Sequence, residues 1–466
     1  MFANIIRISS LLKINRTIRI MLRTIADLGI VFPFVFLYSK IIKEIAPDDK
    51  VDPEKRFTLL AINPTRFLGD LELLAESDKF RILTLSFNWQ LRLLAIYWPS
   101  KTNWDWDSYF NPDKCNDKNL TALQQALRKF LKKFLKNLYK KLDIDAVIGP
   151  SFYYQEDYDI GLISNEIGTP YIVIQRDRIS GIPNKERTLY KKISRAYKFR
   201  ASHLIIQDEE MREYLIKVGY VSRDNISNLG LLGMDKFVKK IKHMKDSDTI
   251  YNVNKSKQKV TLFSFPVSVG LKGKLNIHLF PDDPNAGYQR LFAKVHNTIA
   301  DLALKNENID FVIKIKWGGI WYESIDKLFR NRGLDIKKIS NLKVLDNISA
   351  HQLILESDVV CGFSSSALLE AAIAAKPVIV PLFDEALRPE YQESIAYFYY
   401  YDLFDCASSV TEFEHLIMER LKNPGPKLSE EFMYKKYEAF ERTVSSLDGN
   451  ALEKYTETIC NLINNK

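Results

Sequence analysis

Residues 358–381 read DVVCGFSSSALLEAAIAAKPVIVP, and this stretch decides the fold. An apolar run ends at Gly362, three serines follow it, and a helical pattern of small apolar residues leads to a second apolar run at 377–381. Two buried strands joined by a helix form a βαβ unit, because parallel strands need a crossover connection. The stretch therefore predicts an α/β domain in which the three serines follow the carboxyl end of a parallel strand and open a helix.

The same alternation of apolar strands and helices runs through the rest of the chain. A long helical pattern occupies 120–142, and a polar stretch at 240–259 interrupts the alternation before it restarts. Tandem domains of this kind bind ligands between them, at the carboxyl ends of their strands. We therefore predict two doubly wound, Rossmann-like α/β domains that face a cleft. The predicted strands are 57–62, 81–86, 146–149, 171–175, 203–207, 260–265, 311–317, 359–362 and 377–381.

The composition excludes several classes of protein. The 466 residues are 46% hydrophobic and 27% charged, which suits a globular chain of two or three domains and not a disordered or fibrous one. The four cysteines and six histidines are scattered, with no C-x-x-C or H-E-x-x-H spacing. We therefore expect a reducing compartment, no disulfide framework, no bound metal and no cofactor.

The amino-terminal residues 1–50 differ from the rest of the chain. Five basic residues, from Arg7 to Arg23, precede the first acidic residue and alternate with apolar ones. The apolar run at 28–38 is shorter than the roughly 20 residues that span a bilayer. We interpret the segment as a basic amphipathic helix on an anionic membrane surface, or alternatively as a helix packed on the first domain. No recognised nucleic-acid motif accompanies the positive charge, so we expect no nucleic-acid partner.

Several residues near the carboxyl ends of the second-half strands suit a bound nucleotide. Serine hydroxyls and backbone N–H groups at a helix start favour an anion, and a carboxylate one turn later suits ribose hydroxyls. Two lysines two positions apart share one face of the strand 311–317 and need an anionic partner. A glycine in the loop after the strand 260–265 would let a phosphate approach the backbone. These residues are Ser364, Ser365, Ser366, Glu370, Lys314, Lys316 and Gly270.

Four segments resemble GT-B glycosyltransferases. The serine stretch is similar to the donor-nucleotide motif of enzymes that build bacterial surface polysaccharide, most of all those that use CMP-sugars, such as Kdo and sialic acid transferases, and their teichoic-acid polymerase relatives. The segments KIKWGG at 314–319, LGLLGMD at 229–235 and LDGNA at 447–451 add to this resemblance. It implies a GT-B fold, a serine pair that holds the nucleotide phosphate, and a C-terminal helix that crosses back onto the first domain.

An inverting transferase of this type has its catalytic base in the first domain, where the base takes the proton of the acceptor hydroxyl. The candidate bases are Asp70, Glu156 and Asp157, which follow strands. Helix capping and the helix dipole are alternative reasons for acidic residues at these positions. Arg176 and Arg178 follow another predicted strand and would face an acidic acceptor or the diphosphate. A retaining mechanism, which needs no such base, stays open.

The expected function is transfer of a sugar from a nucleotide-activated donor, preferably a CMP-sugar, to a cell-surface polysaccharide or a lipid-linked acceptor. The enzyme would be metal-independent and peripheral on the cytoplasmic face of the inner membrane. Alternatives are a CDP-glycerol or ribitol phosphotransferase on the same fold, and a non-catalytic subunit that binds a glycan or a sugar nucleotide. The expected parts are a membrane-associated segment, an acceptor domain, a linker, a donor domain and C-terminal helices that cross back, at 1–50, 51–240, 241–258, 259–425 and 426–466.

Overall fold

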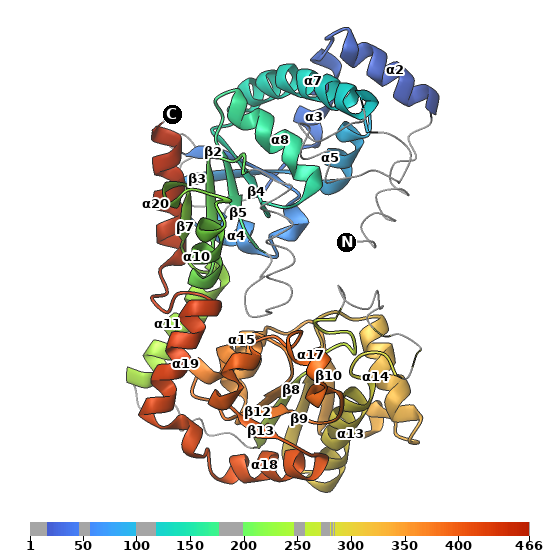
Figure 1. Cartoon of the computed structure of the whole chain (residues 1–466), viewed down its shortest axis with the longest axis vertical. Coiled ribbons are helices and arrows are strands. Elements are labelled where there is room, and N and C mark those ends of the chain that lie inside the picture. Colours follow the sequence, from blue (N-terminus) through green and yellow to red (C-terminus); the bar gives the residue numbers. More distant parts are fainter. Residues whose placement is uncertain are drawn as a thin grey trace. The chain divides into compact units, whose positions relative to one another are not determined.

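The chain forms two compact units (Figure 1). Unit 1 comprises Met1–Arg178, Leu189–Lys236 and Asp448–Lys466, and unit 2 comprises Ile179–Thr188 and Phe237–Leu447. The computed structural model describes residues 16–45, 56–98, 118–176, 199–246, 257–271, 280, 283 and 285–465.

The sheet of unit 1 has seven strands in the order β1-β3-β2-β4-β5-β6-β7. The edge strand β1 is antiparallel to β3, and the other pairs are parallel. The chain runs from β2 to β3 in one direction and then crosses to β4 on the other side of β2, so the order reverses between β2 and β4. The strands are β1 (Lys43–Glu44), β2 (Phe57–Ile62), β3 (Phe80–Leu85), β4 (Ala146–Gly149), β5 (Tyr171–Ile174), β6 (His203–Ile206) and β7 (Ile226–Asn228).

Helices cover both faces of this sheet, as a parallel sheet requires (Figure 1). The inner strands β2, β4 and β5 are near-continuous apolar runs, and β4 and β5 are buried at every position. The described helices of unit 1 are α2 (Arg16–Asp27), α3 (Phe32–Ile41), α4 (Asp70–Ala75), α5 (Phe87–Leu94), α7 (Lys118–Leu142), α8 (Gln155–Glu166), α10 (Glu209–Lys217) and α20 (Ala451–Asn464), and α11 (Asp235–Asp246) begins in this unit.

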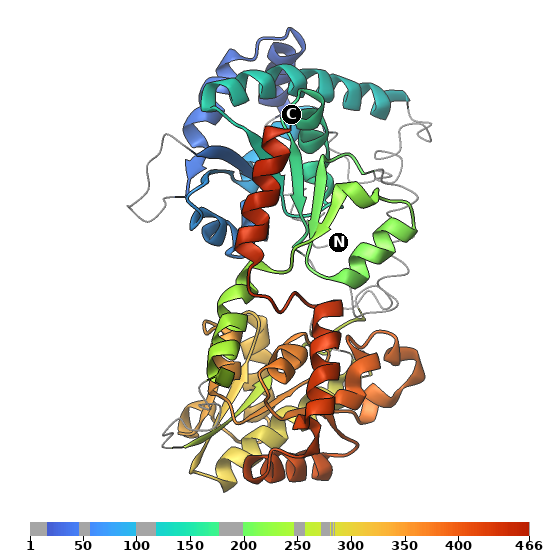
Figure 2. The same cartoon turned by 90° about the vertical axis from the view of Figure 1, so that its left-hand side faces the viewer.

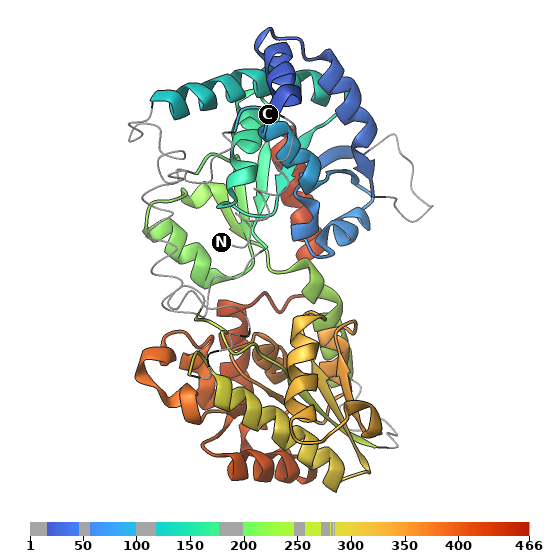
Figure 3. The ribbon, with the colours of Figure 1, turned by 90° about the vertical axis from the view of Figure 1, so that its right-hand side faces the viewer.

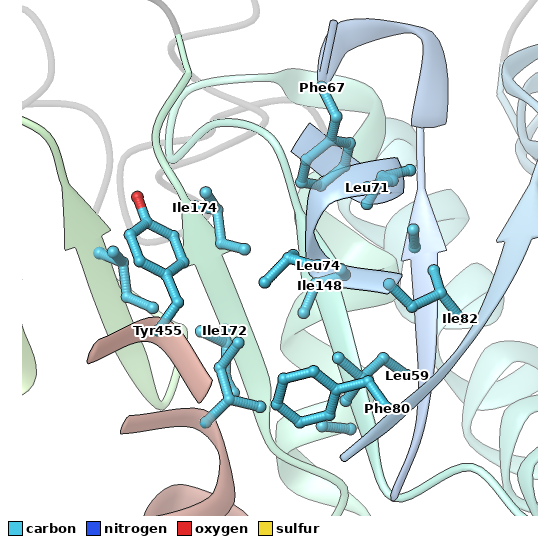
Figure 4. Packing of buried hydrophobic residues seen from close by; sticks show 14 of the residues in the cluster. Leu59, Phe67, Leu71, Leu74, Phe80, Ile82, Ile148, Ile172, Ile174 and Tyr455 are labelled. Carbon is cyan, nitrogen blue, oxygen red and sulfur yellow. The ribbon is translucent and has the colours of Figure 1, made fainter. Parts of the chain in front are cut away.

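The C-terminal helix α20 belongs to unit 1 and lies along its sheet (Figure 2). Tyr455 and Ile459 are part of the same buried cluster as Ile172 and Ile174 of β5 (Figure 4). The Asp235 carboxylate caps α20, because its two oxygens accept the first two N–H groups of the helix, each at 2.9 Å. The segments LGLLGMD and LDGNA, which the sequence presents 212 positions or more apart, therefore form one docking contact. This contact confirms that the C-terminal helix returns to the first domain.

Unit 2 is built on six parallel strands in the order β10-β9-β8-β11-β12-β13. Numbered within the unit this is 3-2-1-4-5-6, the order of Rossmann folds, with its reversal between β8 and β11. The strands are β8 (Gln258–Phe263), β9 (Ile309–Lys314), β10 (Leu342–Leu345), β11 (Val359–Gly362), β12 (Val378–Pro381) and β13 (Asp405–Ala407). The helices are α13 (Gln289–Lys305), α14 (Ile320–Arg330), α15 (Ala350–Glu356), α16 (Ala367–Ile373), α17 (Pro389–Gln392), α18 (Val410–Lys422) and α19 (Glu430–Thr443).

The structure confirms the α/β architecture and moves several predicted boundaries. The strand predicted at 311–317 ends at Lys314, so Lys316 lies beyond it and the predicted shared face of the two lysines is wrong. Helix α11 occupies the start of the predicted linker 241–258. Helix α19 packs on α16 in unit 2, so the chain returns to unit 1 at Asp448 and not at residue 426. Residues 16–45 are part of unit 1, because β1 extends its sheet.

A buried glutamate closes the N-terminus of α13. Glu385 is 2% exposed, and its carboxylate accepts the N–H groups of Arg290 (3.1 Å) and Leu291 (2.9 Å) and the Nε of Arg290 (3.0 Å). We expect Glu385→Ala to destabilise unit 2 by about 2–3 kcal/mol, because one buried and one partly buried helix N–H group lose their acceptor. The exposed neighbour Glu393→Ala is the control and should change the stability by less than about 0.5 kcal/mol. Calorimetric unfolding of both variants tests this, and equal stabilities would contradict it.

Candidate functional site

Polar side chains gather at the point where the strand order of unit 1 reverses. Asn63 follows β2, and Glu156 and Asp157 occupy the first turn of α8, after β4. Gln90 of α5 links them: its Nε2 donates to the Asp157 Oδ1 (2.6 Å) and to the Glu156 carbonyl (2.8 Å), and its Oε1 accepts the Asn63 N–H (3.0 Å). The Asn63 side chain donates to the Glu156 carboxylate at 3.5 Å. All four residues are buried.

The buried environment changes the acidity of this carboxylate pair. Burial raises the pKa of Glu156 and raises the pKa of Asp157 well above its usual range, and the negative charge of Glu156 raises the latter further. The Arg66 guanidinium lowers the pKa of both groups, but less than burial raises it. Two adjacent buried carboxyls cannot both be ionised at low cost, so the pair favours a form that keeps a proton.

The third candidate base, Asp70, forms an ion pair with Arg176. Arg176 follows β5, and its Nε lies 3.0 Å from the Asp70 carboxylate and 3.3 Å from the Phe67 carbonyl. Burial raises the pKa of Asp70 to about 6, although the Arg176 charge lowers it. Directly before Asp70, Leu68 has a φ of 53° and is 70% exposed, and Gly69 has a φ of 97°. The sequence predicted a catalytic role for Asp70 and an acceptor-binding role for Arg176, and the structure joins the two residues in one ion pair.

In unit 2 the three serines follow β11, at the reversal of its strand order, but only Ser366 stands at the N-cap of α16. Ser364 has a φ of 52°; its N–H donates to the Tyr401 hydroxyl (3.1 Å) and its Oγ accepts the Ala396 N–H (2.9 Å). The Oγ of Ser365 accepts the N–H two residues later (3.3 Å). The prediction that all three serines open the helix is wrong, because the left-handed Ser364 turns the chain first.

A buried carboxylate stands one turn into α16. The Oγ of Ser366 donates to the Glu370 Oε1 at 2.9 Å, which confirms the prediction that Glu370 and Ser366 share one face of this helix. The Nε2 of His351, on α15, lies 3.4 Å from the other Glu370 oxygen, and the imidazole stacks on the Phe237 ring with 4.3 Å between centroids. These two contacts orient the carboxylate of Glu370.

The two predicted lysines differ in their surroundings. The Nζ of Lys314 donates to the carbonyls of Ile315 (2.6 Å) and Asp346 (2.9 Å), and burial lowers its pKa. Lys316 is exposed, and its Nζ lies 5.1 Å from the centre of the Trp317 ring. Lys316 is therefore the better placed of the two to receive an anionic ligand.

The remaining predicted site residues are Gly270 and Arg178. Gly270 has a φ of 72°, and a Cβ there would meet the Ser394 carbonyl oxygen at 1.8 Å, so close packing requires glycine; phosphate binding at this loop stays a prediction. Arg178 lies outside the described residues. Within the described part of the chain, no group of three or more His, Cys, Asp or Glu side chains could hold a metal ion. Metal independence stays a prediction.

Sequence reasoning missed three members of these clusters: Asn63, Gln90 and His351. Asn63 stands in an Asn-Pro turn directly after a strand and adopts a φ of 53°, so its position at a strand end was a usable signal. Gln90 and His351 lie on helices with no distinguishing motif around them, and only the tertiary fold brings them to Asp157 and Glu370.

No protein-family model matches the chain, and no curated protein matches it. The chain is similar to the UDP-GlcNAc 2-epimerase of Neisseria meningitidis bound to UDP-GlcNAc (14% identity, TM-score 0.45, 87% of this chain and 100% of that one). It is also similar to the wall teichoic acid polymerase TagF with CDPG (12%, 0.48, 97% and 98%) and to Anabaena HepE in complex with UDP and glucose (13%, 0.43, 87% and 100%). Identities and scores this low do not define a function.

Proposed function

We propose that the protein is a glycosyltransferase that takes its sugar from a nucleotide-activated donor. The observation that carries this proposal is the Ser366–Glu370–His351 cluster, which stands where the strand order of a Rossmann-type sheet reverses. Open α/β sheets bind ligands at this position, beyond the carboxyl ends of their strands. Fold alone does not define a reaction, so the proposal depends on the chemistry of these side chains.

Unit 2 would hold the nucleotide. The Glu370 carboxylate, oriented by Ser366 and His351, would accept hydrogen bonds from the ribose hydroxyls. The exposed Lys316 would neutralise phosphate charge as the nucleotide leaves. The hydroxyls of Ser364 and Ser365 accept backbone N–H groups, and each would donate its own O–H to the phosphate.

Unit 1 would supply the base, and Asp70 is the candidate that its geometry favours. The acceptor hydroxyl would transfer its proton to the Asp70 carboxylate as its oxygen bonds to the anomeric carbon, and the bond from that carbon to the phosphate oxygen breaks. A carboxylate with a pKa of about 6 is largely ionised at neutral pH and is a stronger base than an ordinary aspartate. Arg176 holds this carboxylate in position. Glu156 and Asp157 would instead shape the loop beside it through Asn63 and Gln90.

The donor we favour is a CMP-sugar and the acceptor a surface polysaccharide or its lipid-linked precursor, on the resemblance of the serine stretch and the basic character of the chain. A CDP-glycerol or ribitol phosphotransferase is the alternative that shares these features. The two are separated by the product, since only the phosphotransferase adds phosphate to the acceptor.

Thermal stabilisation of the purified protein by CMP, CDP, UDP, GDP and ADP tests nucleotide binding and its base preference, with and without a chelator. A ligand at 100 times its Kd stabilises by about 2.7 kcal/mol, or roughly 5–10 °C for a unit of this size. Glu370→Gln should weaken binding about 10- to 100-fold, because charge-assisted hydrogen bonds to the ribose are lost. Glu430→Gln, an exposed glutamate of α19, is the matched control and should bind normally. If none of these nucleotides stabilises the protein, the proposal is overturned.

A further inference from the structure

The amino-terminal helices α2 and α3 lie at one end of unit 1 (Figure 3), and they carry an exposed apolar surface. Of the large hydrophobic side chains that are exposed among the described residues, a group on α2, α3 and the turn between them forms this patch. Its members are 43–73% exposed: Ile18, Ile20, Met21, Leu28, Ile30, Phe32, Phe36 and Leu37. An exposed apolar cluster of this kind marks an interaction site in a soluble domain.

Helix α2 leaves part of its apolar surface exposed. Two of its arginines contact the domain: the Nη1 of Arg19 donates to the Trp98 carbonyl (3.4 Å), and the Arg23 guanidinium lies 5.5 Å from the centre of the Tyr97 ring. Ile20 and Met21 are meanwhile more than half exposed. Ala26 is buried and Leu22 and Ile25 are half-buried, so α2 packs some of its apolar side chains on the domain and leaves others exposed. An amphipathic helix on a globular protein usually turns its whole apolar side to the core.

Helix α3 is apolar on all sides and is covered on only one. Phe34 stacks edge-on against Phe130 of α7 with 5.1 Å between centroids, and Tyr38 packs on Phe134 at 5.3 Å. Phe32 and Phe36, on the opposite side, are 73% and 51% exposed. The packed side fixes α3 on the domain, so the exposed phenylalanines have no described protein surface to cover them.

A row of lysines borders this patch. Helix α7, which packs against α2 and α3, has no acidic residue, and two of its exposed lysines lie beside the helices that carry the patch. Lys141 lies 5.3 Å from the centre of the Phe36 ring, and a Cβ on Gly29 would be 3.0 Å from the Lys133 Nζ. The exposed lysines of α7 are Lys118, Lys129, Lys132, Lys133, Lys136, Lys140 and Lys141.

Acidic residues are nearly absent from the amino-terminal part of the sequence. Asp27 is the single acidic residue among positions 1–43 of the sequence, and its carboxylate accepts a hydrogen bond from the Tyr97 hydroxyl at 2.8 Å. Exposed aromatic and aliphatic side chains bordered by lysines match the two layers of an anionic bilayer surface, acyl chains below and phosphate headgroups above.

We propose that the exposed apolar side chains of α2 and α3, with the lysines of α7, form a docking surface for an anionic lipid bilayer. The helices lie in the plane of the membrane interface and do not cross it. No single helix among the described residues is long and apolar enough to span a membrane; α2 and α3 would pass together, but they are bent by 114°. The contacts of Arg19 with Trp98, and of Phe34 with Phe130, keep both helices on the domain.

Cosedimentation of the full-length protein with vesicles tests this docking surface. The vesicles are phosphatidylcholine alone, or phosphatidylcholine with one part in three of phosphatidylglycerol. We expect binding to the anionic vesicles only, weakened by added salt. Phe32→Ser combined with Phe36→Ser should lower the affinity by about 100-fold or more. Lys133→Glu combined with Lys141→Glu should lower it by at least about 20-fold.

Matched substitutions in unit 2 serve as controls. Tyr399→Ser with Tyr434→Ser removes two exposed aromatic rings, and Lys337→Glu with Lys338→Glu reverses the charge of two exposed lysines. Neither pair of substitutions should change vesicle binding. Calorimetric unfolding of every variant shows that it is folded. Failure to bind anionic vesicles, or binding that the two test variants leave unchanged, overturns the proposal. Retention of the protein in the vesicles after an alkaline wash would indicate a spanning segment and would also overturn the proposal. Self-association in solution that the test variants abolish would indicate a second copy of the chain as the occupant, with the same consequence.

Discussion

Asp70→Asn is expected to lower kcat by roughly 10²–10⁴-fold, the usual contribution of a positioned general base. The substitution keeps the size of the side chain and a hydrogen-bond acceptor for Arg176, but it removes the group that takes the proton. The exposed Glu72, two residues along the same helix, provides the control: Glu72→Gln should retain activity within a few-fold. Initial rates of donor turnover at saturating donor measure both. An Asp70→Asn variant that is folded and fully active would remove Asp70 from the mechanism.

The pH dependence of the rate distinguishes a base from a structural residue. The acid limb of kcat/KM should have an apparent pKa of about 6, because the ionised carboxylate is the active form. The positive charge of Arg176 lowers this pKa, so Arg176→Ala should raise it and move the acid limb to higher pH. A purely structural role for the ion pair predicts a lower rate with an unmoved limb.

Ile459→Ala is expected to destabilise unit 1 by about 2–5 kcal/mol, the largest stability effect that we predict for a single substitution. Ile459 is fully buried in the cluster that α20 shares with β5 and α4. Removing its side chain leaves a cavity in a core that the Asp235 cap and the Tyr455–Gly230 hydrogen bond (3.0 Å) hold in place. For a unit of about this size, the unfolding temperature should fall by roughly 5–15 °C.

The same chemical change at an exposed position is the control for Ile459. Ile320→Ala, at the start of α14 in unit 2, removes a side chain that is 54% exposed and should shift unfolding little. Differential scanning calorimetry measures both variants. If Ile459→Ala unfolds like the unaltered protein, α20 contributes little to unit 1, and the returning helix is not part of its core.

The strands were predictable because their residues are buried on both faces. Runs such as 57–62, 146–149 and 359–362 match the observed strands at both ends, since a covered parallel strand is a continuous apolar run. Strand β7 was missed because it has three residues, of which Ser227 and Asn228 are polar and half-buried. The strand predicted at 311–317 extends past the observed end of β9 at Lys314, because the apolar residues at 315 and 317 continue the strand pattern in the sequence.

The site was predictable only where its residues are close in the chain. Ser366 and Glu370 are four positions apart on a helix, so helical periodicity places them together. Asp70 and Arg176 are 106 positions apart, and each was identified by its own strand end. Their pairing needed the strand order, because it depends on β2 and β5 lying on either side of β4. The exposure of Ile20 and Met21 on α2 likewise depends on how Arg19 and Arg23 contact the domain.

Nucleotide release from intact donors tests the proposed function most directly. The purified protein is incubated with CMP-, CDP-, UDP- and GDP-linked donors and bacterial membranes as a source of acceptor, and the freed nucleotide and the labelled product are measured. We predict release from one class of donor, with transfer of its sugar, and loss of both in Asp70→Asn and Glu370→Gln but not in Glu72→Gln. If nucleotides bind and no donor is turned over, the protein is a binding subunit and the assignment as a glycosyltransferase is contradicted.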